Sequence, residues 1–272
     1  MSVTEIAPAK VNLVLHVGQR REDGLHDICS LFATIDLADT VTVSPAGRDE
    51  VVCPGVEGPN LAAAAIEAYR REAPAPSVRA EIEKRIPVAA GLAGGSADAA
   101  AVLRALDRLS DAPLGAERLR AIATGLGSDV PSQVEPRHAL VTGAGERVEP
   151  VSLPEMWLVL VPQAAGLSTA AVYREADRIR STRERLDPGA LRAVAALPVE
   201  ALAGRLQNDL EPAARSLRPD LGAPLRELRQ AGALAALVTG SGPTTFGVFA
   251  SAEAAARAAG RIDGAFVAAP AA

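Results

Sequence analysis

The chain has 272 residues, of which 49% are hydrophobic and 22% charged, so it can bury a sizeable core and is not expected to be largely disordered. Its formal net charge of -5 gives no reason to expect a nucleic-acid or membrane partner, because both are usually met by clustered Lys and Arg. We therefore expect a diffusible small-molecule ligand.

The N-terminus from Met1 to Lys10 lacks the apolar core of a signal peptide, and no run of about 18 apolar residues predicts a membrane span. Cys29 and Cys53 have no metal-ligand spacing and are expected to be free thiols. The sequence thus predicts a cytoplasmic protein and leaves its oligomeric state open.

Lysine is rare in this chain. Of the 28 basic residues only Lys10 and Lys84 are lysine, and the other 26 are arginine. A lysine retained in such a composition suggests a place where a compact ammonium is needed and a flat guanidinium does not serve.

The first predicted elements are a strand, a turn and a helix. Alternating apolar residues predict a strand over Lys10–Val17, and Asp23–His26 has the composition of a turn. Asn60 is a suitable N-cap for an alanine-rich helix over Leu61–Arg71. A second strand is predicted over Val78–Ile86.

A glycine-rich turn follows that strand and leads into a helix with one apolar face, formed by Ala99, Val102, Leu103, Leu106 and Leu109. Another helix is predicted over Ala116–Thr124. Asp129 is expected on the loop after it, because Pro131 biases Val130 towards an extended conformation.

The second half alternates helices with strands, a pattern typical of the α+β class. The expected helices are Ser168–Arg180, Pro198–Leu206 and Ala223–Ala231, and the expected strands are Trp157–Val161, Leu237–Thr239 and Thr244–Phe249. Prolines punctuate the stretch before Trp157. We therefore predict two domains, 1–152 and 153–272.

The glycine-rich turn is the strongest local signal, because glycines let the backbone approach a polyphosphate and the helix start adds positive partial charge. It lacks the Gly-Lys-Ser/Thr ending of a Walker A loop and the Gly-x-Gly-x-x-Gly spacing of a dinucleotide-binding fold. The alternative is a plain connection between a strand and a packing helix. The predicted ATP-binding residues are Pro87, Val88, Ala89, Ala90, Gly91, Leu92, Ala93, Gly94, Gly95, Ser96 and Ala97.

Three further segments accompany this turn: Lys10 with Asn12, Asp129 after Gly127, and a second glycine turn over Gly240–Thr244. In order and spacing these segments resemble the motifs of the GHMP kinases over nearly the whole chain. The resemblance implies a two-domain fold with a ribosomal-protein-S5-like N-terminal domain and a ferredoxin-like C-terminal domain. It also implies ATP as phosphoryl donor and Mg²⁺.

Five runs make a sharper match within that superfamily: Pro8–Leu13, Arg21–His26, Ala90–Ala100, Leu126–Pro131 and Asn208–Glu211. They resemble kinases of the non-mevalonate isoprenoid pathway, which phosphorylate a hydroxyl of a cytidine-diphosphate-linked substrate. The resemblance implies that Lys10 and Asp129 are catalytic. The Ser96 hydroxyl is the candidate group near Mg²⁺. The resemblance assigns substrate binding to Asn12, His26, Tyr173, Gly240, Ser241 and Gly242.

Some positions depart from that pattern. Leu25 stands where the family commonly has a tyrosine that stacks on the base, and Ala93 and Ala97 replace a frequent Gly and Ser. Two alternatives therefore stay open: another GHMP kinase acting on homoserine, mevalonate or a sugar, and a nucleotide-binding regulator without turnover.

Overall fold

The computed structural model describes residues 1–164 and 166–271, which form two compact units. Unit 1 comprises Met1–Ala9, Leu37–Val88 and Ala93–Pro136; unit 2 comprises Lys10–Asp36, Ala89–Leu92 and Arg137–Ala272. The units thus interleave along the chain. The division into domains 1–152 and 153–272 stays a prediction.

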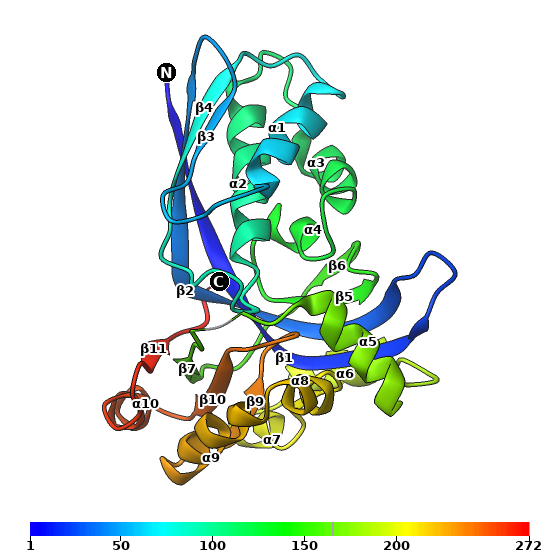
Figure 1. The fold of residues 1–272 in the computed structure, drawn as a ribbon, viewed down its shortest axis with the longest axis vertical. Helices are drawn as coiled ribbons and strands as arrows, with labels where there is room; N and C mark the ends of the chain where they lie inside the picture. Colours follow the sequence, from blue (N-terminus) through cyan, green and yellow to red (C-terminus); the bar gives the residue numbers. More distant parts are fainter. Residues whose placement is uncertain (165, 272) are drawn as a thin grey trace. The chain divides into compact units, whose positions relative to one another are not determined.

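Helices and strands account for most of both units (Figure 1). The strands are β1 (Val3–Arg20), β2 (His26–Pro45), β3 (Glu50–Val52), β4 (Val78–Glu83), β5 (Ala139–Gly143), β6 (Arg147–Pro150), β7 (Trp157–Val161), β8 (Gln207–Asn208), β9 (Ala235–Val238), β10 (Thr245–Phe249) and β11 (Phe266–Ala268). The helices are α1 (Leu61–Arg70), α2 (Gly94–Leu109), α3 (Gly115–Thr124), α4 (Val130–Gln133), α5 (Thr169–Ile179), α6 (Pro188–Ala195), α7 (Val199–Ala203), α8 (Glu211–Leu217), the 3-10 helix η1 (Pro219–Leu221), α9 (Gly222–Gln230) and α10 (Ala252–Ala259).

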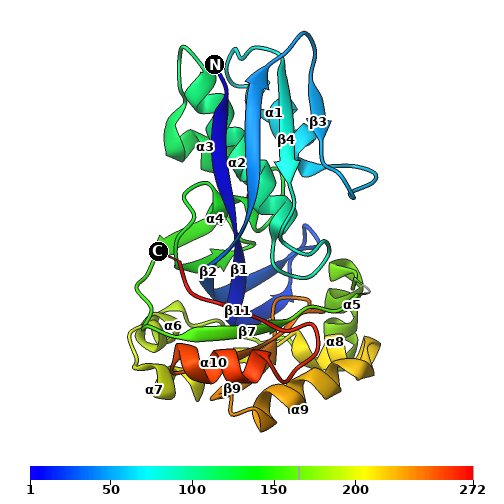
Figure 2. The same ribbon diagram turned by 90° about the vertical axis from the view of Figure 1, so that its left-hand side faces the viewer.

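Unit 1 is a helical layer packed on strands. The second part of β2 pairs antiparallel with β4, and β3 pairs parallel with β4. Helices α1 and α2 cover one face of these strands (Figures 1 and 2). The two helices are rich in buried alanines, whose small side chains allow close packing. Tyr69 of α1 donates a hydrogen bond to Asp107 of α2 at 3.0 Å, which ties the two helices together.

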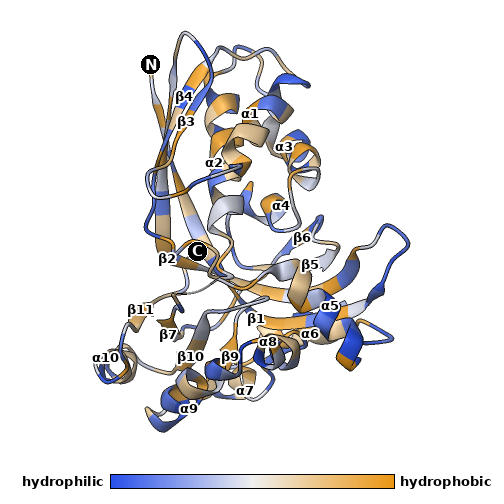
Figure 3. Ribbon diagram, in the orientation of Figure 1, coloured by the Kyte–Doolittle hydropathy of each residue, from blue (hydrophilic) through white to orange (hydrophobic). Residues whose placement is uncertain are grey.

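Unit 2 contains a four-stranded antiparallel sheet in the order β11-β7-β10-β9. Helix α9 packs on β9 and β10, and α10 packs on β7. The first part of β2 pairs with β5, which pairs with β6, and β1 pairs parallel with β8. Figure 3 shows long hydrophobic stretches on β1, in keeping with the continuous run of buried residues in this strand.

The predicted helices and strands of the second half are confirmed, with α5 and β7 close to their expected bounds. The first strand is longer than predicted, since β1 begins at Val3. Within the described residues, no helix is long and apolar enough to cross a membrane.

Candidate active site

The ammonium of Lys10 is positioned by neutral oxygens of unit 2. Lys10 lies on β1 and is 4% exposed. Its Nζ donates to Oδ1 of Asn12 at 2.6 Å and to the carbonyl oxygen of Gly91 at 3.5 Å. The same nitrogen lies 4.9 Å from the centroid of the Phe32 ring, within range of a cation–π contact. These contacts hold the ammonium beside the part of the glycine-rich turn that belongs to unit 2.

Asn12 is itself held by surrounding protein groups. Its Nδ2 donates to Oγ of Ser30 at 2.9 Å, and its backbone N–H donates to Oγ1 of Thr239 at 2.9 Å. Ser30 and Thr239 are fully buried. The predicted role of Asn12 in reading the substrate stays a prediction, and its contacts also make it the residue that orients Lys10.

Two glycine turns approach each other closely in unit 2. A Cβ on Gly91 would lie 2.8 Å from the carbonyl oxygen of Gly242 and 2.9 Å from that of Thr239. Gly91 also has a φ of 79°, in the left-handed region that favours glycine. The backbone N–H of Thr244 donates to the carbonyl oxygen of Ala90 at 3.3 Å. Only glycine at position 91 permits this arrangement.

The turn between β9 and β10 is anchored on both sides. Asn208 donates from Nδ2 to the carbonyl oxygen of Gly240 at 2.8 Å, and the hydroxyls of Ser241 and Thr169 lie 2.9 Å apart. A Cβ on Gly240 would lie 3.5 Å from Nζ of Lys10. The structure therefore brings the predicted residues Lys10, Asn12, Gly91 and Gly240 together.

His26 and Tyr173 also lie together in unit 2, with ring centroids 5.2 Å apart and ring planes inclined by 37°. Nδ1 of His26 lies 2.9 Å from the carbonyl oxygen of Gly18, which can only accept, so Nδ1 carries a proton in this geometry. Nε2 lies 3.4 Å from Oδ2 of Asp177. Leu25, next to His26, is 49% exposed. Two of the residues that the resemblance assigned to substrate binding are thus neighbours, and their role stays a prediction.

In unit 1, helix α2 begins without a side-chain cap. The residue before it, Ala93, has the left-handed φ of 58°, whereas α1 is capped by Asn60, whose side chain accepts from the N–H of Ala62. The nearest atom to a Cβ on Gly95 would be Cδ1 of Leu61, at 4.0 Å. The first turn of α2 thus presents backbone N–H groups with open space around Gly95, as phosphate-binding helix starts do.

A buried ionic cluster of Asp39, Lys84 and Asp98, which we call the Lys84 cluster, lies at this helix start. Nζ of Lys84 pairs with both carboxylates, at 2.7 Å from Oδ2 of Asp98. Burial raises the pKa of Asp98 to about 6, against the lowering influence of Lys84. Burial alone would lower the pKa of Lys84, but the two carboxylates more than offset it, so this pKa is raised.

Asp129 is half-buried and stands at the N-cap position of α4. Here the expectation of an extended Val130 was wrong, because Val130 is the first residue of that helix and Pro131 the second. A proline fits the first helical turn, where the missing N–H has no intrahelical partner. The hydroxyl of Ser132 donates to the carbonyl oxygen of Asp129 at 2.8 Å and steadies this turn.

No group of three or more His, Cys, Asp or Glu that could hold a metal lies in the described part of the chain. Mg²⁺ usually keeps several waters and binds substrate phosphates with few protein ligands, so one hydroxyl can suffice. Ser96, half-buried in the first turn of α2, is compatible with that role. Its assignment to the metal stays a prediction.

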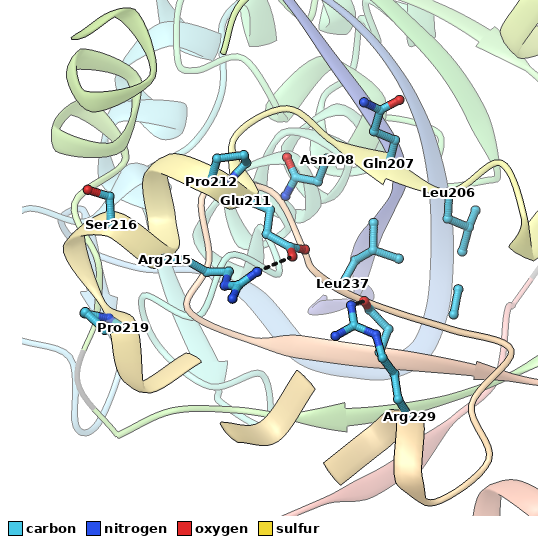
Figure 4. A pocket seen from close by; sticks show the side chains of 12 residues that line it. Leu206, Gln207, Asn208, Glu211, Pro212, Arg215, Ser216, Pro219, Arg229 and Leu237 are labelled. Atoms are coloured by element: carbon cyan, nitrogen blue, oxygen red, sulfur yellow. Dashed lines mark hydrogen bonds and ion pairs between the residues drawn. The ribbon is translucent and has the colours of Figure 1, made fainter. Parts of the chain in front are cut away.

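A hollow of about 720 Å³ in unit 2 lies along the edge strand β9, between β8, α8 and α9 (Figure 4). Glu211 accepts the backbone N–H of Val238 at 3.0 Å, and Arg229 donates to the carbonyl oxygen of Ala236 at 2.8 Å. Side chains thus satisfy backbone groups of the edge strand. The residues that line the hollow include none of the predicted catalytic or substrate residues.

Sequence reasoning missed three side chains of this site. Ser30 lies on β2 and Thr239 directly follows β9, and only the tertiary contacts with Asn12 distinguish them. Asp177 had a usable signal, since it lies four residues after Tyr173 on α5 and so shares a helix face with it.

Comparison with known proteins agrees with this geometry. The family model described as the GHMP kinases N terminal domain matches residues 60–135, and the one described as GHMP kinases C terminal matches residues 189–268. The fold and these matches define a GHMP kinase with the predicted two-domain fold, an enzyme that uses ATP as phosphoryl donor.

Similarity to individual proteins is more specific. The chain is 46% identical to a 4-diphosphocytidyl-2-C-methyl-D-erythritol kinase of Streptomyces coelicolor, over 90% of this chain and 87% of that one. It is also 46% identical to the enzyme of that name from Nocardia farcinica, over 96% and 90%. The chain therefore belongs to the 4-diphosphocytidyl-2-C-methyl-D-erythritol kinase family.

Solved structures give the same grouping. A crystal structure of 4-(cytidine 5'-diphospho)-2C-methyl-D-erythritol kinase matches with a TM-score of 0.80 and 37% identity, and the match covers 98% of each chain. Homoserine kinase from Cytophaga hutchinsonii matches with a TM-score of 0.75 at 18% identity, over 99% of this chain and 94% of that one. That second likeness shows the fold alone.

Proposed function

We infer that the chain transfers the γ-phosphoryl group of ATP to the 2-hydroxyl of 4-(cytidine 5'-diphospho)-2-C-methyl-D-erythritol, in the non-mevalonate isoprenoid pathway. The observation that carries this inference is the 46% identity, over 90% of the chain, to a relative named for that activity. The identity is far above the 18% shared with homoserine kinase, so this substrate is favoured over the other GHMP substrates.

Lys10 and Asp129 are the proposed catalytic residues. Phosphoryl transfer mainly requires that the acceptor hydroxyl be positioned and that developing charge be stabilised. Asp129 would accept the proton of the hydroxyl, and the Lys10 ammonium would stabilise the transferring group. The hydrogen bond from Lys10 to Asn12 supports this role, because it fixes the ammonium through a neutral partner.

The glycine-rich segment Pro87–Ala97 is proposed to bind the phosphates of ATP. The uncapped start of α2 and the space around Gly95 support this assignment. Bound Mg²⁺ would neutralise phosphate charge, with Ser96 as a protein ligand. The chain's own contribution is to direct the first N–H groups of α2 at the phosphates.

The cytosine base is proposed to bind at His26 and Tyr173. Their rings lie 5.2 Å apart, and the proton on Nδ1 leaves Nε2 as an acceptor for a donor group of the base. The second glycine turn, with Gly240, Ser241 and Gly242, and Asn12 are proposed to contact the same substrate. The substrate is a small molecule, and we propose that the enzyme works in the cytoplasm without a nucleic-acid or membrane partner.

The test is ADP formation by the purified chain with ATP, Mg²⁺ and one acceptor at a time: the cytidine-linked substrate, homoserine or mevalonate. We expect turnover with the first only, and ³¹P NMR of the product should show a new phosphomonoester. Asp129→Asn should lower kcat by about 10³-fold while ATP still binds. Tight ATP binding without ADP formation from any acceptor would identify a regulator instead.

A further inference from the structure

The Lys84 cluster occupies both ends of the glycine-rich segment. Lys84 and the next two residues lead directly into Pro87, and Asp98 follows Ala97 as the fifth residue of α2. Nζ of Lys84 lies 2.7 Å from Oδ2 of Asp98, so one side chain links the entry of the segment to its exit. All three members of the cluster belong to unit 1.

Asp39 holds the entry through the backbone. It lies on β2 and is fully buried. One oxygen pairs with Lys84, while the other accepts the N–H groups of Arg85 at 2.6 Å and Ile86 at 2.8 Å. The two peptide groups immediately before Pro87 are therefore fixed to a strand of the sheet.

The cluster has too much negative charge to be explained by stability. Two carboxylates share one ammonium, and Asp98 is only 2% exposed. Among the described residues its Oδ1 has no hydrogen-bond partner. Buried ion pairs are often no more stable than apolar replacements of similar volume, and an orphaned buried oxygen is costly. Because burying the Asp98 carboxylate is costly, we expect the cluster to have a role other than stability. Its position at both ends of the glycine-rich segment indicates that role.

The choice of lysine at this position follows from close packing. A Cβ on Gly94 would lie 3.2 Å from Nζ of Lys84, so the ammonium packs against the backbone of the first helical residue. A guanidinium is larger and planar and does not fit the same space. This explains why position 84 is one of two lysines among 28 basic residues.

We propose that the Lys84 cluster is a positioning device that sets the start of α2 relative to the strand entering the glycine-rich segment, and thereby the affinity for ATP. The proposal rests on the proposed binding of ATP phosphates by that segment. Lys84, Asp39 and Asp98 act through the backbone of the segment and are positioning residues, not catalytic ones. Misplacement of a binding group by about 1 Å can cost about 100-fold, so a small shift of the helix start is sufficient.

The test compares the two ends of α2. Asp98→Ala removes the link to Lys84, whereas the control Asp107→Ala removes a carboxylate at the other end that accepts the N–H groups of Leu114 at 2.6 Å and Gly115 at 3.2 Å. We expect Asp98→Ala to raise KM for ATP by about tenfold or more, with kcat and KM for the acceptor little changed. Asp107→Ala should lower Tm but leave KM for ATP within about twofold.

Two further variants separate geometry from charge. Asp98→Asn keeps the shape and an oxygen acceptor for Lys84, so KM for ATP should return to within about threefold of wild type. Lys84→Arg keeps the charge but not the fit, and should weaken ATP binding like Asp98→Ala. Equal ATP affinities for Asp98→Ala and Asp107→Ala would overturn the proposal, as would an Asp98→Asn as weak as Asp98→Ala.

A Gly95→Ala variant distinguishes failure of this proposal from failure of the ATP assignment. The added methyl group meets no protein atom closer than 4.0 Å, so it should fill ligand space without disturbing the fold. Unchanged ATP affinity in Gly95→Ala would refute the assignment of the segment. Weakened affinity in Gly95→Ala with wild-type affinity in Asp98→Ala and Lys84→Arg would refute the positioning role alone.

Discussion

The only two lysines of the chain are both largely buried, yet their surroundings differ in kind. Lys84, in unit 1, lies between two buried carboxylates, whose combined charge exceeds its own. Lys10, in unit 2, donates to an amide oxygen and a peptide oxygen of that unit. Buried carboxylates therefore hold the Lys84 ammonium against the backbone, whereas an amide oxygen and a peptide oxygen help to orient Lys10.

The largest expected effect tests the Lys10 side of this comparison. Lys10→Met should lower kcat by about 10³-fold, because the charge that stabilises the transferring phosphoryl group is lost. KM for ATP should change far less. Single-turnover kinetics with both substrates saturating would measure the chemical step directly. A variant with near wild-type kcat would remove Lys10 from the catalytic pair.

Two glycines of the glycine-rich segment, Gly91 and Gly95, should respond differently to an added methyl group. Gly91→Ala, near Lys10, forces a Cβ to within 2.8 Å and 2.9 Å of two carbonyl oxygens at a φ of 79°. We expect it to lower the free energy of unfolding by about 3 kcal/mol. Urea denaturation checks this, with Gly95→Ala as the matched control that should change stability by less than about 1 kcal/mol.

The excess negative charge of the Lys84 cluster predicts a dependence of stability on pH. Burial raises the pKa of Asp98 from 3.8 to about 6, so ionisation disfavours the folded state. The contribution that protonated Asp98 makes to the free energy of unfolding is fully present below pH 4, and it is lost as the pH rises to about 6. The difference between wild type and Asp98→Asn should therefore shift by up to about 3 kcal/mol across that range.

Urea denaturation of both proteins between pH 4 and pH 7 measures this difference. Titrating groups outside the Lys84 cluster contribute equally to wild type and variant and cancel. If the free energies of unfolding of wild type and Asp98→Asn changed with pH in parallel, Asp98 would not have the raised pKa. The excess negative charge around Lys84 would then be disproved.

The smallest expected effect concerns the substrate side of unit 2. Leu25 is 49% exposed beside His26, so a ring at position 25 can be added without displacing the core. Leu25→Tyr should lower KM for the cytidine-linked substrate several-fold, since base stacking contributes about 1 to 3 kcal/mol. KM for ATP should not change. Leu234→Tyr, at another exposed position, is the control, and an equal effect there would argue against stacking.

Much of the fold was predictable because its signals are local. Alternation, capping residues and helical periodicity placed α1, α5 and β7 near their observed bounds. The short helix α4 was not predicted. Pro131 biases its predecessor against helix, but that bias is weaker than the constraints of the turn that α4 completes.

By itself the sequence determined the family and the order of its motifs, and it named the residues that are proposed to carry chemistry, because these are properties of residue type and spacing. The tertiary structure decided their partners. Asn12 meets Thr239 across 227 positions, and Lys84 meets Asp39 across 45. No local pattern encodes such pairs, since they arise when strands and helices bury their faces together. That packing alone placed Lys84 between Asp39 and Asp98 and so indicated its proposed role in holding the glycine-rich segment.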